Sequence, residues 1–354
     1  MPGMVIVMSK PKLVIFGNFG YKKNQIDGQT IKTRQLKEVL SERLGNENII
    51  YTDTSYARSK PMMILREMMT HVRHCSHLLV LPGKNGLKFF LPFYVRWKKM
   101  LGIDVRYVVI GGWLDHFLNG KKYYLNLCKQ LNGIYVETNL MKEKLTSIGL
   151  DNVYVLPNFR RIDFKIKRVN KVEKPVKLVY FSRVMKEKGI EFAIEAVKEI
   201  NKDGNIVKFD IYGPIDQKYK KLFYEQLSCS KNNIVYKGII EPINNQIYLQ
   251  LSQYDLMIFP TYYHGEGFPG AVIDSFISGV PVLASDWNYN SEIIEDNKTG
   301  KLFIHQDIED LITQLKFLLE KPDLIYEMKI NCLEKARNYD ADLVIEKLIK
   351  DLGL

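Results

Sequence analysis

Four ionisable side chains in the second half of the chain have types and spacing suited to holding a phosphorylated ligand. Arg183 and Lys188 follow one apolar run, while Glu266 and Asp274 lie eight positions apart within the segment 260–294. Arginine offers a rigid fork of donors and lysine a point charge, so a pair at a strand's carboxyl end could hold a diphosphate. A carboxylate can accept two hydroxyls, as on a ribose. Taken singly, each residue could equally be a solvated loop charge or, for Asp274, an acid that complements a helix dipole.

A glycine-rich loop separates the two carboxylates and leads into a helical pattern. The residues at the entry of that helix are Gly267, Phe268, Pro269 and Gly270. The first N–H groups of a helix have no acceptor within it, so they can bind a phosphate or hydroxyls. We therefore predict that this loop adds backbone donors to the site.

The elements that must position these residues alternate between strand and helix patterns twice along the chain. Strand patterns occur at 12–17, 48–53, 77–82, 105–112, 133–138, 152–157, 176–182, 206–213, 233–238, 255–260, 280–285 and 301–304. Such alternation is typical of doubly wound α/β domains, and two of them are expected to face each other across a cleft. The predicted parts are a Rossmann-like domain at 1–160, a charged linker at 161–175, a second Rossmann-like domain at 176–338, and an amphipathic helix at 339–354 that packs back on the first domain.

The chain has 354 residues and a formal net charge of +11, which is unevenly distributed. Residues 1–160 carry 24 Lys and Arg against 11 Asp and Glu, whereas residues 161–354 carry 27 against 29. The basic first half suggests an anionic partner such as nucleic acid, a membrane surface or a phosphorylated substrate, although charge also serves solubility. The four cysteines share no ligand spacing, so we predict no metal site, no disulfide framework and a reducing compartment. No apolar run reaches the length of about 18 residues that a membrane span needs.

The segment 83–102 interleaves aromatic with basic residues. Its aromatic side chains are Phe89, Phe90, Phe93, Tyr94 and Trp97, and its basic ones are Lys84, Lys88, Arg96, Lys98 and Lys99. One interpretation is docking on an anionic membrane leaflet. The alternative is an ordinary helix that buries its aromatic stripe.

Several motifs resemble retaining glycosyltransferases of family four. They are Ser182-Arg183 followed by KGIE, then FPTYYHGEGFPGAVID, SGVPVLASD and NSEII in the second half, with DGQTIKT and YVLPNFR in the first. The likeness is to bacterial capsule and polysaccharide biosynthesis enzymes, and it covers nearly the whole chain. It implies the GT-B fold of two Rossmann-like domains and a nucleotide-diphosphate-sugar donor.

The resemblance also implies roles for individual residues. Arg183 and Lys188 match the pair that neutralises the donor diphosphate, and Glu266 matches the first carboxylate of the family's Glu-x7-Glu motif. Asp274 stands at the second, which holds the ribose, but is one methylene shorter than the family's glutamate. Gly28 matches a first-domain glycine whose backbone approaches the phosphates.

Three weaker candidates complete the predicted site. His116 is the nearest match to a first-domain histidine that the family often has near the reacting sugar. Base recognition is expected near Gly213 and Ile239, through the backbone.

The sequence therefore predicts a retaining, metal-independent hexosyltransferase. It would use a UDP- or GDP-sugar as substrate, need no cofactor, and extend a glycan or lipid-linked oligosaccharide in surface polysaccharide biosynthesis. A cytoplasmic place, at the inner face of the membrane, is expected. Three alternatives stay open. They are a nucleotide-sugar epimerase of the same fold, a sugar-nucleotide-binding regulator without catalytic activity, and a basic nucleic-acid-binding protein, which would leave Glu266 and Asp274 unexplained.

Overall fold

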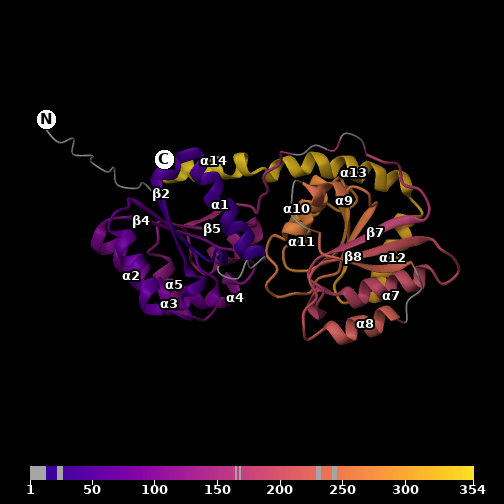
Figure 1. Ribbon diagram of the computed structural model, residues 1–354, viewed down its shortest axis with the longest axis horizontal. Helices are drawn as coiled ribbons and strands as arrows, with labels where there is room; N and C mark the ends of the chain where they lie inside the picture. The colour runs from indigo at the N-terminus through magenta and orange to yellow at the C-terminus, as the bar shows by residue number, and fades with distance from the viewer. Residues whose placement is uncertain (1–12, 22–26, 164–165, 167–168, 229–232, 241–244) are drawn as a thin grey trace. The chain divides into compact units, whose positions relative to one another are not determined.

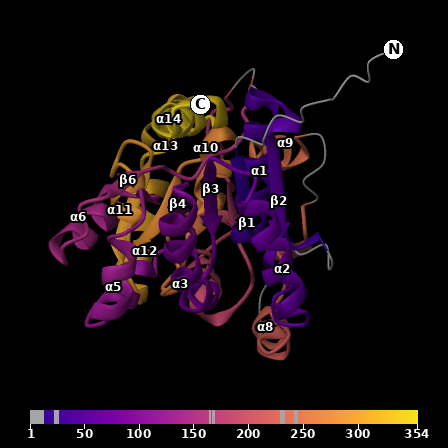
Figure 2. The ribbon, with the colours of Figure 1, turned by 90° about the vertical axis from the view of Figure 1, so that its left-hand side faces the viewer.

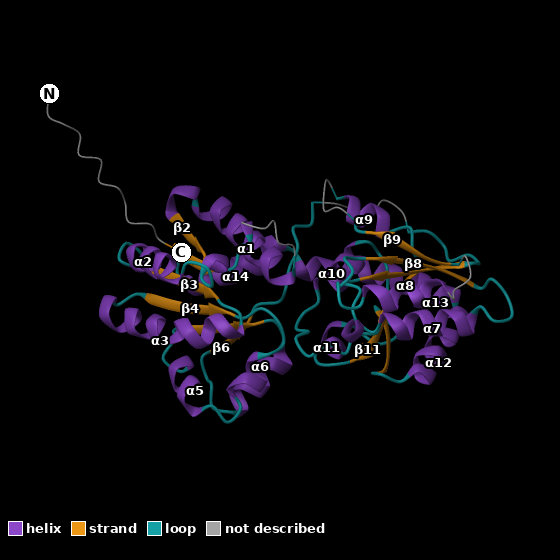
Figure 3. Cartoon of the chain, turned by 60° about the horizontal axis from the view of Figure 1, so that its bottom comes forward, coloured by secondary structure: helices purple, strands orange, loops and turns teal. Residues whose placement is uncertain are grey.

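The chain forms two compact units in the computed structural model, which describes residues 13–21, 27–163, 166, 169–228, 233–240 and 245–354. The first unit is Met1–Asn158 together with Ala341–Leu354, and the second is Phe159–Asp340 (Figure 1). Each unit is built on one parallel sheet flanked by helices (Figure 3).

The sheet of the first unit has six strands within the described residues, in the order β2-β1-β3-β4-β5-β6. This order can be followed across Figure 2. The strands are β1 (Leu13–Gly17), β2 (Ile49–Asp53), β3 (His77–Leu81), β4 (Asp104–Val108), β5 (Gly133–Val136) and β6 (Val153–Val155). All five residues of β1 are buried, as expected for a parallel strand covered on both faces. Strand β2 lies at the edge of the sheet and pairs on one side only, with β1.

The helices of the first unit connect successive strands. They are α1 (Gly28–Leu44), α2 (Pro61–Val72), α3 (Lys84–Leu101), α4 (Leu114–Leu118), α5 (Lys122–Cys128) and α6 (Asn139–Ser147), with short 3-10 turns at Asn46–Asn48 and Thr54–Tyr56. The carboxyl ends of β1 and β2 therefore lead into the loops before α1 and α2, and residue 28 is the first of α1.

The last helix, α14 (Ala341–Leu352), belongs to the first unit and packs against α1. Figure 1 shows the yellow α14 beside the indigo α1. Arg43 pairs with Asp342 at 3.0 Å, and the Tyr135 hydroxyl donates to Asp351 at 3.2 Å. The predicted return of the C-terminal helix to the first domain is thus confirmed.

The second unit repeats the architecture with the strand order β12-β11-β10-β7-β8-β9. Its strands are β7 (Val176–Phe181), β8 (Val207–Tyr212), β9 (Ile234–Gly238), β10 (Leu256–Phe259), β11 (Val282–Asp286) and β12 (Gly300–Ile304). Its helices are α7 (Ile190–Ile200), α8 (Lys220–Ser228), α9 (Gln246–Leu251), α10 (Gly270–Ile277), α11 (Asn290–Ile293), α12 (Ile308–Leu319) and α13 (Pro322–Ala336), with 3-10 turns η4 (Lys186–Lys188) and η5 (Arg337–Tyr339). The neighbours β7 and β10 carry at their carboxyl ends the loops that hold the predicted site.

The boundaries of the units differ from the predicted domains by a few residues. The chain leaves the first unit after Asn158, and the stretch 161–175 is grouped with the second unit rather than standing between the two. The reason is local pairing, because the Arg160 backbone N–H donates to the Tyr339 carbonyl at 2.9 Å. The outgoing and returning segments therefore pair within the second unit before the chain reaches α14.

Candidate functional site

Lys188 and Glu266 are in contact in the second unit, although 78 positions separate them in sequence. Lys188 ends the turn η4, and Glu266 lies in the loop between β10 and α10. The Lys188 Nζ donates to Glu266 Oε2, and the Thr261 hydroxyl donates to the same oxygen at 2.9 Å. The two charged side chains are only 14% and 9% exposed, so the pair is held in a fixed place and largely shielded from water.

Close backbone packing brings these two residues together. Gly189 has φ +70°, and a Cβ there would lie 2.0 Å from the Pro260 carbonyl oxygen. The backbone N–H of Tyr262 also donates to the Glu187 carbonyl at 2.9 Å. The loop after β7 and the loop after β10 can approach this closely because residue 189 has no side chain.

A buried tyrosine supports the loop that carries Arg183 and Lys188. The Tyr180 hydroxyl donates to the Arg183 carbonyl at 2.9 Å and lies 3.5 Å from the Lys188 carbonyl. Burial raises the pKa of Tyr180 well above its ordinary value, so the hydroxyl stays protonated and able to donate. Sequence reasoning missed this residue, because a tyrosine within an apolar strand is most simply interpreted as part of the hydrophobic core.

Arg183 is exposed, and its guanidinium makes no ion pair or side-chain hydrogen bond that the described part of the chain records. It stands in the same loop as Lys188, after the carboxyl end of β7. The cation is therefore available to an incoming anion.

Asp274 lies in the second turn of α10 and is bound by an arginine. The Arg160 Nε donates to Asp274 Oδ1 at 2.8 Å, and Nη2 donates to Oδ2 at 3.2 Å. Both side chains are about one tenth exposed, at 10% and 9%. This two-pronged contact is the strong form of an ion pair. The ribose contact that the sequence predicted for Asp274 stays a prediction, and each carboxylate oxygen retains a further lone pair for it.

The Arg160 guanidinium also fills the space beside the first turn of α10. A Cβ at Gly270 would lie 2.0 Å from Arg160 Nη2, so a side chain there would displace the guanidinium. A cation near a helix N-terminus is disfavoured by the helix dipole, and the Asp274 carboxylate offsets that cost. Sequence reasoning also missed the role of Arg160. It is the last residue of the motif YVLPNFR, and nothing in that motif indicates that its partner is Asp274.

The three residues directly before α10 are buried. Gly267, Phe268 and Pro269 are all inaccessible or nearly so, and the Phe268 ring packs on Tyr339 with centroids 5.0 Å apart. Pro269 is the N-cap of α10, so the helix begins at Gly270, two residues later than predicted.

The residues expected near the base lie at the carboxyl ends of β8 and β9. The Gly213 N–H donates to the Gly238 carbonyl at 2.8 Å, and the Tyr236 hydroxyl donates to the Gly213 carbonyl at 3.0 Å. Ile239 is 57% exposed, an unusual exposure for isoleucine, and it offers an apolar surface beside these backbone groups.

The two first-unit candidates are both exposed. Gly28 begins α1, whose N-cap Asp27 accepts from the Thr30 N–H at 2.9 Å, and a Cβ at Gly28 would meet nothing within 4 Å. His116 is 71% exposed, with Nε2 3.9 Å from Asp115 Oδ2. The structure thus leaves room for a ligand at Gly28, and the assignment of His116 stays a prediction.

A buried ion pair of the first unit was also missed. Lys32 Nζ lies 2.7 Å from Glu137 Oε1, with exposures of 1% and 4%. Glu137 Oε2 accepts from the Gly111 N–H at 3.1 Å. The pair therefore ties α1 to the end of β5 and to the glycine turn after β4.

Helix α3 buries part of the aromatic segment and exposes the rest. Phe90, Tyr94 and Trp97 are buried in the first unit, so most of the stripe belongs to the core. Phe89 is 55% exposed and Met100 64%. Around them lie exposed basic residues, which are Lys84, Lys88, Arg96 and Lys99.

The described residues lack two kinds of feature. No cluster of three or more His, Cys, Asp or Glu suited to a metal ion occurs among them. Within the same residues, no helix has the length and hydropathy needed to cross a bilayer.

The chain is similar to known proteins in sequence and in fold. A family model described as Glycosyl transferases group 1 matches residues 161–339. The poly(ribitol-phosphate) alpha-N-acetylglucosaminyltransferase of Staphylococcus aureus is 28% identical over 238 residues, which are 65% of this chain and 46% of that protein. An alpha-1,3-N-acetylgalactosaminyltransferase of Campylobacter jejuni, whose name specifies N,N'-diacetylbacillosaminyl-diphospho-undecaprenol, is 24% identical over 52% of this chain and 46% of its own length. The chain thus spans about half the length of these two relatives.

The fold as a whole has a solved counterpart. HepE of Anabaena, in complex with UDP, superposes with a TM-score of 0.74 at 13% identity, covering 97% of this chain and 99% of that one. The two six-stranded parallel sheets accordingly have the GT-B fold, as the sequence predicted.

Proposed function

Because the chain belongs to the group 1 glycosyl transferases, we propose that it transfers a sugar, with retention, from a nucleotide-diphosphate-sugar to a glycan acceptor. The observation that carries this proposal is the shielded Lys188–Glu266 pair beside the exposed Arg183, all at the carboxyl ends of two neighbouring strands. Ligands of open α/β sheets bind at such strand ends. The relatives give the epimerase alternative no support.

The chemistry follows from where charge develops. Breaking the bond between sugar and phosphate builds negative charge on the diphosphate and positive charge on the sugar ring. Lys188 and Arg183 stabilise the leaving diphosphate, and fixed donors of this kind are worth about 10²–10³ in rate each. Arg183 and Lys188 stabilise the diphosphate in this proposal, and no metal ion is required.

In this proposal Glu266 positions the donor sugar and does not act as a nucleophile. Its Oε2 already accepts from Lys188 and Thr261, which lowers its nucleophilicity and leaves Oε1 to accept a hydroxyl of the donor sugar. The acceptor then arrives on the face from which the diphosphate leaves, and the configuration is retained. Asp274, held by Arg160, offers its remaining lone pairs to the ribose.

We propose UDP as the donor's nucleotide, because HepE, which shares the fold, binds UDP. The glycan acceptor is proposed to be lipid-linked and part of a surface polysaccharide, on the analogy of the C. jejuni relative. We further propose that the enzyme meets this acceptor at the cytoplasmic face of the membrane. The exposure of Phe89 and Met100 among the basic residues of α3 supports docking there.

A thermal-shift screen tests the nucleotide. We expect UDP at 100 times its dissociation constant to add about 2.7 kcal/mol of stability, which raises Tm by about 5–10 °C for a unit of this size. ADP serves as the control, and GDP and the two sets of nucleotide sugars complete the panel. If neither UDP, GDP nor any of their sugars raised Tm, the proposed donor site would be rejected.

Vesicle flotation tests the membrane surface. The protein should float with vesicles containing phosphatidylglycerol at low salt, and not with neutral vesicles, because each basic residue near the surface adds about 1 kcal/mol. Reversing the charges at Lys88, Arg96 and Lys99 should abolish flotation. The matched control reverses the exposed Lys177, Lys202 and Lys221 of the second unit. Equal losses in both triple variants would show that net charge, and not α3, is responsible.

A further inference from the structure

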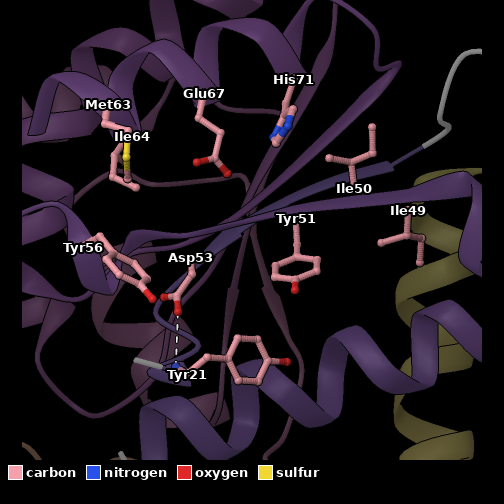
Figure 4. Close-up of a pocket in the computed structure, with 10 residues that line it drawn as sticks. All are labelled: Tyr21, Ile49, Ile50, Tyr51, Asp53, Tyr56, Met63, Ile64, Glu67 and His71. Carbon is pink, nitrogen blue, oxygen red and sulfur yellow. Dashed lines mark hydrogen bonds between the residues drawn. The ribbon is translucent and has the colours of Figure 1, made fainter. Parts of the chain in front are cut away.

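A pocket of the first unit lies along the open edge of its sheet. It has a volume of about 660 Å³ and wraps around the edge strand β2 (Figure 4). Met63, Glu67 and His71 reach it from α2, and Tyr51 comes from β2 itself, with Tyr21 beside it. None of the residues assigned to the donor lines this pocket, so it is a separate feature.

Two tyrosine rings form the aromatic part of the pocket. Tyr21 is 46% exposed and Tyr51 is 39% exposed, and their rings pack edge-to-face with centroids 6.1 Å apart. Both also pack on the buried Phe19, at 5.6 Å and 4.9 Å. The loop that presents Tyr21 is fixed by Asp53, whose carboxylate accepts from the Phe19 N–H at 3.0 Å and the Tyr21 N–H at 3.3 Å. The rings are thus held in place before any ligand arrives.

The polar part of the pocket is made by α2. Glu67 and His71 are one turn apart on the same face, and Figure 4 shows both side chains directed toward β2. His71 Nδ1 bonds the buried Thr52 hydroxyl at 2.9 Å, which leaves Nε2 for a ligand. Burial lowers the pKa of His71 although the nearby Glu67 acts in the opposite direction, so the imidazole is neutral near pH 7.

The charges around the pocket select a neutral ligand. Asp53 and Glu67 both line it, and two carboxylates repel an anion. A cation is also disfavoured, because it would meet the like charges of Arg34 and Lys37, which lie 5.0 Å and 5.2 Å from the ring centroids of Tyr21 and Tyr51. A neutral ligand with many hydroxyl groups fits, since each hydroxyl can both donate and accept. The apolar C–H face of a sugar ring also suits an exposed tyrosine face.

We propose that this pocket is a glycan-binding subsite that holds a neutral pyranose unit of the acceptor. The proposal rests on the proposed function, because a transferase that extends a glycan needs to hold a chain longer than the reacting sugar. Tyr51 supplies the stacking surface, and Glu67 accepts from the sugar's hydroxyls. The open backbone edge of β2 offers further donors and acceptors.

Ligand-observed NMR on the full chain, without nucleotide, tests the subsite. The probes are chitotriose and maltotriose, two neutral trisaccharides of different sugars. We expect at least one to bind the wild-type protein with a dissociation constant on the order of 1 mM. Tyr51→Ala and Glu67→Gln should each weaken that binding, by about tenfold for the tyrosine. Tyr123→Ala is the matched control, because Tyr123 is a 61% exposed tyrosine of the same unit outside the pocket, and it should bind as the wild type does.

Two readouts separate this proposal from its competitors. An end-capped peptide of alternating valine and threonine probes strand addition to the edge of β2. Binding of this peptide that Tyr51→Ala abolishes, with no binding of either trisaccharide, would overturn the glycan assignment. The UDP-induced shift in Tm should be unchanged in Tyr51→Ala. A normal UDP shift with no trisaccharide binding rejects the subsite alone, whereas the loss of every nucleotide shift rejects the proposed function.

Discussion

Replacing Lys188 with alanine should lower the rate of sugar transfer by about 10²–10³-fold. The physical reason is that Lys188 is a cation held at one place by Glu266, so it stabilises the leaving diphosphate without reorganising during the reaction. The measurement is kcat/KM for release of the nucleotide, using the donor that gives the largest shift in Tm. Lys186→Ala is the matched control, because Lys186 is an exposed lysine of the same 3-10 turn.

Loss of folding must be separated from loss of catalysis in this variant. Removing Lys188 leaves the buried Glu266 carboxylate with Thr261 as its remaining partner, so stability should fall as well. The double variant Lys188→Met with Glu266→Gln removes both charges and should regain most of the lost stability while staying inactive. Transfer near the wild-type rate in a folded Lys188 variant would contradict the diphosphate assignment.

Replacing Arg160 with methionine should cost about 3–5 kcal/mol of unfolding free energy in the second unit. The change leaves the Asp274 carboxylate, which is 9% exposed, without the guanidinium that binds both of its oxygens. In a urea titration, the transition of this unit should move to lower concentration. Lys202→Met provides the comparison, because Lys202 pairs with Glu199 at the surface and should cost less than about 1 kcal/mol.

A double-mutant cycle distinguishes the ion pair from the packing of Arg160. If the cost comes from the uncompensated carboxylate, the variant that combines Arg160→Met with Asp274→Leu should be markedly more stable than Arg160→Met alone. Additive losses in the double variant would mean that the arginine stem, packed beside Gly270, carries the stability instead. The same variants report on the ribose, since binding of UDP should weaken wherever the position of Asp274 is disturbed.

The order of strand and helix patterns was enough to predict the fold, because each buried parallel strand reads as a short apolar run between polar loops. The approach of Lys188 to Glu266 was also within reach. Both residues follow strand ends, and the carboxyl ends of neighbouring parallel strands meet at one edge of a sheet. The motif resemblance then supplied a reason to look at these two residues together.

Other parts of the site depend on contacts between distant residues, which no local sequence pattern indicates. Arg160 and Asp274 are 114 positions apart, and nothing in either segment marks them as partners. The role of Tyr180 depends on which carbonyls its hydroxyl meets, whereas its position in the sequence shows only that it is buried. Phe90 and Phe89 are adjacent and alike in type, yet one is in the core and the other exposed. Helical phase decides such a difference, and interleaved basic residues obscured that phase.

The return of α14 to the first unit has a consequence for synthesis on the ribosome. Proteins emerge from their N-terminal end, and domains generally fold as they emerge. Here the helix that packs on α1 is translated only after all of residues 159–340 have been made. Until then the α1 surface that α14 covers stays exposed, whereas the second unit is a continuous stretch and can complete its own core first. The unit that is made first is therefore the one that finishes folding last.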